Sequence, residues 1–318
     1  MSLRDLFSTP PPDVAVEIDH THVAAARVGW RGREAIITAH TSEPLAPGVV
    51  VPGLASLNIP DVPALSQVVA RVLAQLGGSR PSRVSLIVPD TVAKVSLLKL
   101  EKVPAKAADL QEIVRWQVRK TAPFPVEHAV LSLSPGATGA DGASEFVVTL
   151  SRADVIQQYE QACMMAGAHA GLVDLSTFGV LNTVLAGPSP PSGDWLLVHV
   201  TDTYLTLAVV RDHALLFFRN RGEEAEGSIA DLIHQTAMYY EDRLNGGGFA
   251  RVLIAGGARL PGGAETVRKG LEERLRVSVE AVDPRGTAGL QDRITASPEL
   301  LDVLAPLVGL LMRERKAA

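Results

Sequence analysis

The chain has 318 residues, of which 47% are hydrophobic and 4% aromatic, and its formal net charge at pH 7 is −5. This acidic balance argues against a nucleic-acid-binding protein, because such proteins usually carry an excess of basic residues. Cys163 is the only cysteine, so neither an internal disulfide nor a cysteine-based zinc site can form.

The sequence predicts no membrane span. The longest apolar stretch, "LLDVLAPLVGLLM" at 300–312, is shorter than the roughly 20 residues that a spanning helix needs, and it contains Asp302. The N-terminal "MSLRDLFSTPPPD" lacks the apolar segment of a secretory signal. We therefore expect a soluble, cytoplasmic protein that reaches a membrane only through its partners.

Strand-like and helix-like segments alternate along the chain, which predicts α/β architecture. Three consecutive strands with tight turns come first, at 13–18, 23–30 and 34–41. The elements expected next are a helix at 63–76, strands at 82–89 and 92–100, a helix at 107–122, a strand at 145–150, a helix at 153–166, a strand at 171–174 and a helix at 177–185. Cys163 falls in the helix at 153–166, where we expect a small core residue and not a nucleophile.

A linker, "GPSPPSG" at 187–193, follows, and the pattern then restarts. The elements expected after it are strands at 195–200, 205–210 and 214–219, a helix at 227–244, a strand at 251–255, a helix at 264–275, a strand at 277–281 and a final helix at 300–312. The final helix should pack against one half of the protein, since its apolar residues have no membrane to enter.

An internal repeat is the main organisational signal. "DVAVEIDHTHVAAARVGWRGREAIITA" and "WLLVHVTDTYLTLAVVRDHALLFFR" share one plan of strand, polar turn, strand, turn and strand. One such unit near the start of each segment predicts two related α/β halves, at 1–186 and 187–318, that meet over a cleft.

The two hairpins, followed by the strand that runs into Gly256 and Gly257, resemble the actin-like ATPase superfamily. In that superfamily two hairpin loops hold the nucleotide phosphates and a late Gly-Gly loop lies against the adenosine. Within it, the chain most resembles the PilM family of type IV pilus assembly proteins. The stretches similar to that family are 84–133, 150–184, 215–221, 254–263 and 304–313. The resemblance implies duplicated RNase H-like halves, with a small subdomain inserted in the first half at about 90–166.

The first nucleotide loop departs from the family pattern of apolar-Asp-apolar-Gly-Ser-x-Ser. Glu17 stands at the position of the metal-side Asp, Asp19 at that of the Gly, and Ala24 at that of a lysine, while Thr21 keeps a hydroxyl. A carboxylate about 4 Å from a phosphate charge costs on the order of 4 kcal/mol at an effective dielectric of about 20. Asp19 therefore predicts weak or absent phosphate binding.

The second loop is altered as well, and the third is not. The family's Asp-apolar-Gly becomes His199, Val200 and Thr201, followed by Asp202, whereas Gly256 and Gly257 keep the family pattern. We expect a degenerate nucleotide site with no catalytic residue and no cofactor. The alternative is an ATP-binding protein of the same fold that uses Mg²⁺, with Glu17 serving for the Asp.

The stretch "VEIDHTH" (16–22) also raises the question of a metal site. Strand alternation would place Glu17 and Asp19 on one face and His20 and His22 on the other, until the turn breaks the pattern. Four ligands cannot easily converge from one tight turn, so we expect polar turn residues and no metal ion.

By resemblance, the chain is expected to be a cytoplasmic scaffold of the pilus assembly complex. Such proteins bind the N-terminal cytoplasmic segment of a PilN-like inner-membrane protein and couple it to other pilus components. We expect the groove between the first half and the inserted subdomain to take this peptide, with the helix at 107–122 as one wall. Its candidate partner-binding residues are Ile113, Trp116 and Gln117; alternatively, Trp116 packs within the subdomain.

Two other members of the superfamily are alternatives to a PilM-like scaffold. The cytoplasmic domain of a type II secretion GspL-like protein normally continues into a transmembrane helix, whereas this chain stops at "MRERKAA". A sugar kinase needs a carboxylate base and a metal-bound phosphate, and the positions that would supply them are altered.

Overall fold

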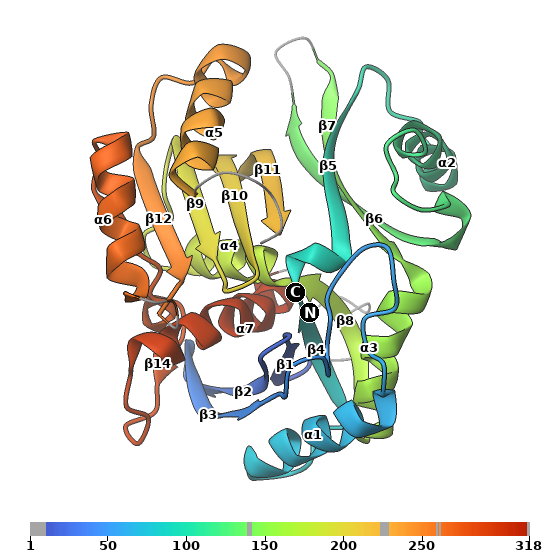
Figure 1. Ribbon diagram of the computed structural model, residues 1–318, viewed down its shortest axis with the longest axis vertical. Helices are drawn as coiled ribbons and strands as arrows, with labels where there is room; N and C mark the ends of the chain where they lie inside the picture. Colours follow the sequence, from blue (N-terminus) through green and yellow to red (C-terminus); the bar gives the residue numbers. More distant parts are fainter. Residues whose placement is uncertain (1–10, 139–141, 223–228, 259, 261, 317–318) are drawn as a thin grey trace.

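The computed structural model describes residues 11–138, 142–222, 229–258, 260 and 262–316. Its strands form two larger sheets and one smaller sheet, and two helices lie between the larger sheets (Figure 1). Within the described residues, no helix combines the length and hydropathy that crossing a membrane requires.

The first sheet has the order β14-β3-β2-β1-β4-β8. β1 is antiparallel to β2 and parallel to β4, and β4 is parallel to β8. The bounds of these strands are β1 (Val14–Ile18), β2 (His22–Arg31), β3 (Glu34–Pro44), β4 (Arg83–Val88), β8 (His169–Leu175) and β14 (Gly289–Leu290).

The second sheet repeats this plan in the order β11-β10-β9-β12-β13. β9 is again antiparallel to the next strand in sequence and parallel to β12, which is parallel to β13. Its strands are β9 (Asp194–Val200), β10 (Tyr204–Arg211), β11 (Ala214–Gly222), β12 (Arg251–Gly256) and β13 (Val279–Ala281). The predicted pair of related α/β halves is therefore confirmed.

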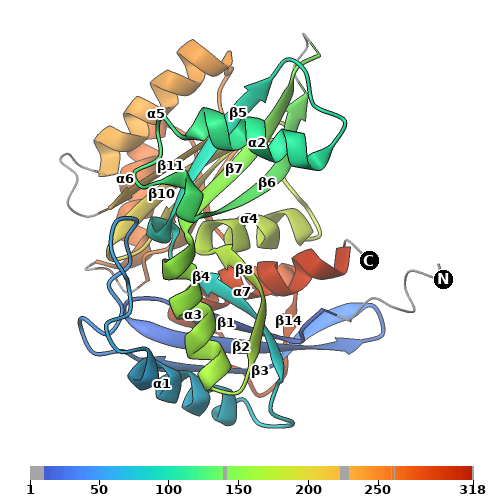
Figure 2. The same ribbon diagram turned by 90° about the vertical axis from the view of Figure 1, so that its right-hand side faces the viewer.

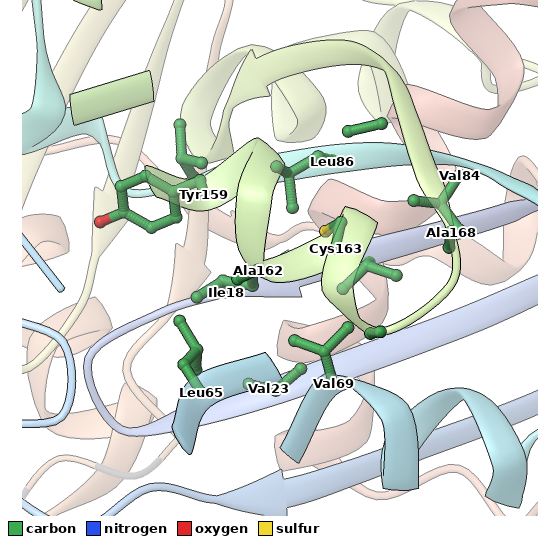
Figure 3. Packing of buried hydrophobic residues seen from close by; sticks show 14 of the residues in the cluster. Ile18, Val23, Leu65, Val69, Val84, Leu86, Tyr159, Ala162, Cys163 and Ala168 are labelled. Carbon is green, nitrogen blue, oxygen red and sulfur yellow. The ribbon is translucent and has the colours of Figure 1, made fainter. Parts of the chain in front are cut away.

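Helices cover the outer face of each sheet. The helices α1 (Val62–Gln75) and α3 (Ala153–Met165) pack on the first sheet, and α5 (Ile229–Leu244) and α6 (Gly263–Leu275) on the second (Figure 1). Figure 3 shows Leu65 and Val69 of α1 and Cys163 of α3 in the first of these cores. As predicted, Cys163 is a buried core residue. The predicted start of α5, at 227, lies outside the described residues.

Both faces of the central strands β1, β4, β9 and β10 are buried, because these strands are apolar. Val14, Val16 and Ile18 belong to the core under α1 and α3, while Ala15 belongs to the core under α7 (Pro298–Lys316). Glu17 shares the face of Ala15, because strand residues alternate between faces. The only charged side chain of β1 is therefore directed toward the space between the two sheets.

The helices α4 (Ser176–Ala186) and α7 fill that space and cross closely (Figures 1 and 2). A Cβ atom added at Gly309 would lie 1.8 Å from the carbonyl oxygen of Gly179, so glycine is required there. The hydroxyl of Thr183 donates to the carbonyl oxygen of Ala305 at 2.5 Å. The final helix contacts strands of both sheets, whereas the sequence led us to expect packing on one half.

The inserted subdomain is a three-stranded antiparallel sheet with one helix. Its strand order is β5-β7-β6, with β5 (Ala93–Leu100), β6 (Ala129–Thr138) and β7 (Ser144–Arg152), and α2 (Ala107–Val118) covers one face (Figure 2). We did not predict β6, because its serines with Pro135 and Gly136 are typical of a loop; pairing with β7 makes it a strand. Three single-turn 3₁₀ helices complete the described chain, η1 (Asp90–Val92), η2 (Val126–His128) and η3 (Pro284–Gly286).

Candidate functional site

The two hairpin turns meet between the sheets and line a cavity of 80 Å³. The cavity is bounded by the β1–β2 turn, the β9–β10 turn, the loop after β12 and the first half of α7. Every cleft residue predicted from sequence lines it, namely Glu17, Asp19, Thr21, Thr201, Asp202, Gly256 and Gly257. The structure also adds three carboxylate or imidazole residues to the lining that we had not assigned to the site: His22, Glu299 and Asp302.

The size of this cavity limits what it can hold. A water molecule takes about 30 Å³ of liquid volume, whereas pockets for drug-sized ligands measure about 300–1,000 Å³. At 80 Å³ the cavity in this structure is smaller than that range.

Glu17 is buried beneath the first turn and hydrogen-bonded. Its Oε1 atom accepts a hydrogen bond from the hydroxyl of Ser176 at 3.1 Å, and its Oε2 atom lies 3.6 Å from Nε2 of His22. Glu17 pairs with Ala24 across the β1–β2 ladder, and His22 lies two residues before Ala24, on the same face. The expectation that Glu17 and His22 lie on opposite faces was therefore wrong, because the hairpin reverses the alternation.

His20 joins the two turns across the cleft. Its Nδ1 atom lies 3.0 Å from Oδ1 of Asp19, and its Nε2 atom lies 3.1 Å from Oδ1 of Asp202 on the second turn. These two hydrogen bonds, Asp19 first and then Asp202, raise the pKa of His20 to about 10 against the opposing effect of burial. His20 in turn lowers the pKa of Asp202.

The same three side chains bear on the question of a metal ion. One ligand atom from each of Asp19, His20 and Asp202 lies within 4.8 Å of the others. Both ring nitrogens of His20 face carboxylates, however, and a protonated imidazole has no lone pair for a metal. Both ring nitrogens are thus engaged by carboxylates, and the group joins residues from two turns where we had considered four residues of one turn.

A buried hydrogen-bond network lies below the second turn. Nδ1 of His199 is 2.7 Å from the hydroxyl of Thr177, and the carboxylate of Asp90 accepts hydrogen bonds from the Thr177 hydroxyl, from the Thr177 N–H at 3.0 Å and from the Thr206 hydroxyl at 2.6 Å. Because the Thr177 hydroxyl donates to Asp90, His199 must donate from Nδ1 to Thr177. Asp90, with 0% of its surface exposed, thus links the first sheet to the second. We did not predict this role of Asp90, since "VPDT" is typical of an ordinary turn.

The Gly-Gly loop has a structural role that needs no adenosine. Gly256 has a φ of 78°, and a Cβ atom there would lie 2.0 Å from the carbonyl oxygen of Val200. The N–H groups of Gly256 and Ala258 donate to the carboxylate of Asp302 on α7, at 3.1 and 2.9 Å. Asp302 thus ties the Gly-Gly loop to α7. Burial raises the pKa of Asp302, and these two N–H groups oppose the rise.

A second cavity, of 340 Å³, forms a groove between the first sheet, α4 and the inserted subdomain. Its floor is apolar, and its subdomain wall is formed by alternate residues of β6 and β7, including Val130, Ser132 and Thr149. Arg313 of α7 forms an ion pair with the buried Asp174 in the lining of the groove. Burial raises the pKa of Asp174, and Arg313 opposes the rise.

The predicted partner-binding residues lie elsewhere. α2 covers one face of the subdomain sheet (Figure 2). It packs on the opposite residues of that sheet, such as Leu131 and Val148, so this helix is not a wall of the groove. Ile113 and Trp116 are 38% and 66% exposed, and Nζ of Lys120 lies 5.7 Å from the Trp116 ring. Trp116 therefore does not pack within the subdomain either. Gln117 is partly buried on the same helix.

Two sheets of the same strand order, with two hairpin turns meeting in a cleft between them, define a protein of the actin-like ATPase fold. The chain is similar in structure to the PilM-PilN type IV pilus biogenesis complex, with a TM-score of 0.80 and 18% identity over 96% of this chain and 99% of the other. It is also similar to a Bacteroides thetaiotaomicron protein with an actin-like ATPase fold, with a TM-score of 0.51 and 7% identity over 84% of this chain and 89% of the other. The predicted resemblance is confirmed by these structures. No family model and no curated protein matches the sequence.

Proposed function

We propose that the chain is a PilM-like scaffold of type IV pilus assembly that binds the N-terminal cytoplasmic segment of a PilN-like inner-membrane protein. The likeness to a solved structure described as a PilM-PilN complex supports the choice of partner. In this proposal the protein is cytoplasmic, lies at the inner membrane through that partner and connects it to other pilus components. The proposed scaffold consists of halves at 1–186 and 187–318, with the insertion at about 90–166. The structure adds that β14 of the second half pairs with β3 of the first sheet, and that α3, within the insertion bounds, packs on the first sheet.

The observation that carries the proposal is the groove between the first sheet and the inserted subdomain. Its apolar residues, among them Val147, Phe178 and Leu185, can hold the side chains of an extended peptide. His213, Asn182 and Arg313 add polar groups that would fix the orientation of the peptide. Its volume of 340 Å³ fits a few side chains, which matches a short segment better than a folded domain.

Calorimetric titration with the N-terminal peptide of the membrane protein encoded beside this gene tests the partner. Wild-type protein should bind the peptide, and Ser132→Arg should weaken binding by at least about tenfold, because an exposed groove residue is replaced by a long charged one. No binding by wild-type protein at high micromolar peptide would reject the partner.

Trp116→Ala is the matched variant for the other candidate surface. Ile113, Trp116 and Gln117 remain a prediction for partner binding, now on the outer side of the subdomain. If the groove is the site, Trp116→Ala binds as wild type does. If that variant loses binding and Ser132→Arg keeps it, the partner binds on α2.

We also propose that the cleft is a pseudo-ATPase site. Three features support this: the cavity measures 80 Å³, Asp19 lies in the former phosphate loop, and Asp302 takes the amides of the Gly-Gly loop. Titration with ATP and Mg²⁺ should show weak binding or none, and no hydrolysis. A dissociation constant in the low micromolar range would favour the alternative of an active ATP-binding protein.

A further inference from the structure

The cavity between the two turns is lined by five carboxylates. Glu17, Asp19, Asp202, Glu299 and Asp302 all line the same cavity. Asp19 comes from the first sheet and Asp202 from the second, so closing the cleft brings two like charges toward each other. Like charges repel, and the repulsion grows as the surroundings lose water. A cation between the turns would offset this repulsion.

We propose that His20 is that cation, and that its contacts with Asp19 and Asp202 form a built-in clasp that holds the two halves closed without nucleotide or metal. The geometry is that of a bridge: each ring nitrogen faces one carboxylate, at 3.0 Å on the first turn and 3.1 Å on the second. The side chains of Asp19 and His20 are 14% and 16% exposed, whereas that of Asp202 is 46% exposed, so water screens the contact across the cleft more than the contact within the first turn.

The pKa of His20 and the buried contacts beneath it support the clasp. The pKa of His20, raised to about 10, favours the protonated ring at neutral pH. The groups that face it are Asp19 beside it and Asp202 across the cleft, while His22 and Glu17 form their own pair below. Below the clasp, the buried carboxylate of Asp90 accepts a hydrogen bond from Thr177 of its own half and one from Thr206 of the second half, and the latter joins the two halves. The clasp therefore closes a cleft whose base is already joined.

The clasp does not depend on the pilus partner, so it can be tested on the purified chain. His20→Gln, Asp202→Asn and the double variant should be compared by hydrogen exchange of the amides in both turns, at 18–22 and 200–204. If His20 bridges the halves, each single variant speeds exchange about tenfold in both turns, since breaking either contact opens the same cleft. The double variant should then show no further increase, because one bridge can be lost only once.

Glu273→Gln is the charge-matched control, since Glu273 is an exposed carboxylate on α6, outside the cleft. This variant should leave exchange in both turns unchanged. The clasp is wrong if each single variant speeds exchange only in its own turn, or if the effects of the two variants multiply in the double variant. Unchanged exchange in all three variants also overturns it.

Discussion

The surroundings of His20 strongly favour its protonated state, so stability should depend on pH through this residue. Its pKa is raised from 6.5 to about 10 by Asp19 and Asp202. A raised pKa in the folded state means that folding favours the protonated ring, so its contribution is complete below about pH 6.5 and is lost as pH rises through about 10. Asp202 has the opposite sign: its lowered pKa gives a contribution that is lost in acid.

The measurement is the difference in unfolding temperature between wild-type protein and His20→Gln across this pH range. We expect the wild type to be more stable by a margin that is largest at about pH 6 and close to zero above about pH 10. His22 and Glu17 lie nearby and are present in both proteins, so their titration cancels in the comparison. A margin that grows with pH would contradict the charge assignment.

Cys163 should be chemically inert in the native protein. Its side chain has no exposed surface, and burial raises the pKa of its thiol to about 12, with a smaller contribution from Glu160. Because the thiolate is the reactive form, an aromatic disulfide reagent should react with the native protein only as fast as it unfolds. The reaction should become rapid in denaturant. Fast labelling of the native protein would mean that α3 opens locally.

At the scale of elements, the crossing of α4 and α7 should be the contact least tolerant of added volume. A Cβ atom at Gly309 would overlap the backbone of Gly179, and backbone cannot rotate away as a side chain can. Gly309→Ala should therefore lower the free energy of unfolding by at least about 2 kcal/mol. Chemical denaturation of the variant and the wild type measures the difference.

Gly270→Ala is the matched control within another helix. Gly270 lies on α6 with no atom within 4 Å of the position its Cβ would take. Alanine there should raise stability by about 0.5–1 kcal/mol, because glycine is a poor helix former and loses more entropy on folding. If the two variants behave alike, the helices cross less closely than described.

At the scale of the whole molecule, the subdomain should be separable from the two sheets. Ala93 and Ser151 are directly paired where β5 leaves and β7 returns to the first half. Paired residues in antiparallel strands have Cα atoms about 4.5–5.5 Å apart, so a short Gly-Ser linker can replace residues 94–150. We predict that this deletion leaves a cooperatively unfolding protein with native-like circular dichroism and no peptide binding.

Two outcomes would contradict that prediction. An insoluble or unfolded product would show that the subdomain is required by the core, to which Val95 and Leu97 contribute from β5. Peptide binding that survives the deletion would place the partner on a surface outside the groove. The reactivity of Cys163 in the deletion variant toward a thiol reagent reports whether the core under α3 is intact.

The repeated hairpins, the alternation of strands and helices and the position of the Gly-Gly loop could be predicted from the sequence, because alternation, helical spacing and glycine turns are local signals. The resemblance to the actin-like superfamily also predicted that the altered residues of the two hairpin loops lie in one cleft. Three contacts could not be predicted and are visible only in the tertiary structure. They are the contact of His20 with Asp202, the hydrogen bonds from the N–H groups of Gly256 and Ala258 to Asp302, and the link between the halves through Asp90. The same holds for β6 and for the groove that it lines. These features depend on how two sheets pack on α4 and α7, and no local pattern records which residues from distant segments such packing brings into contact.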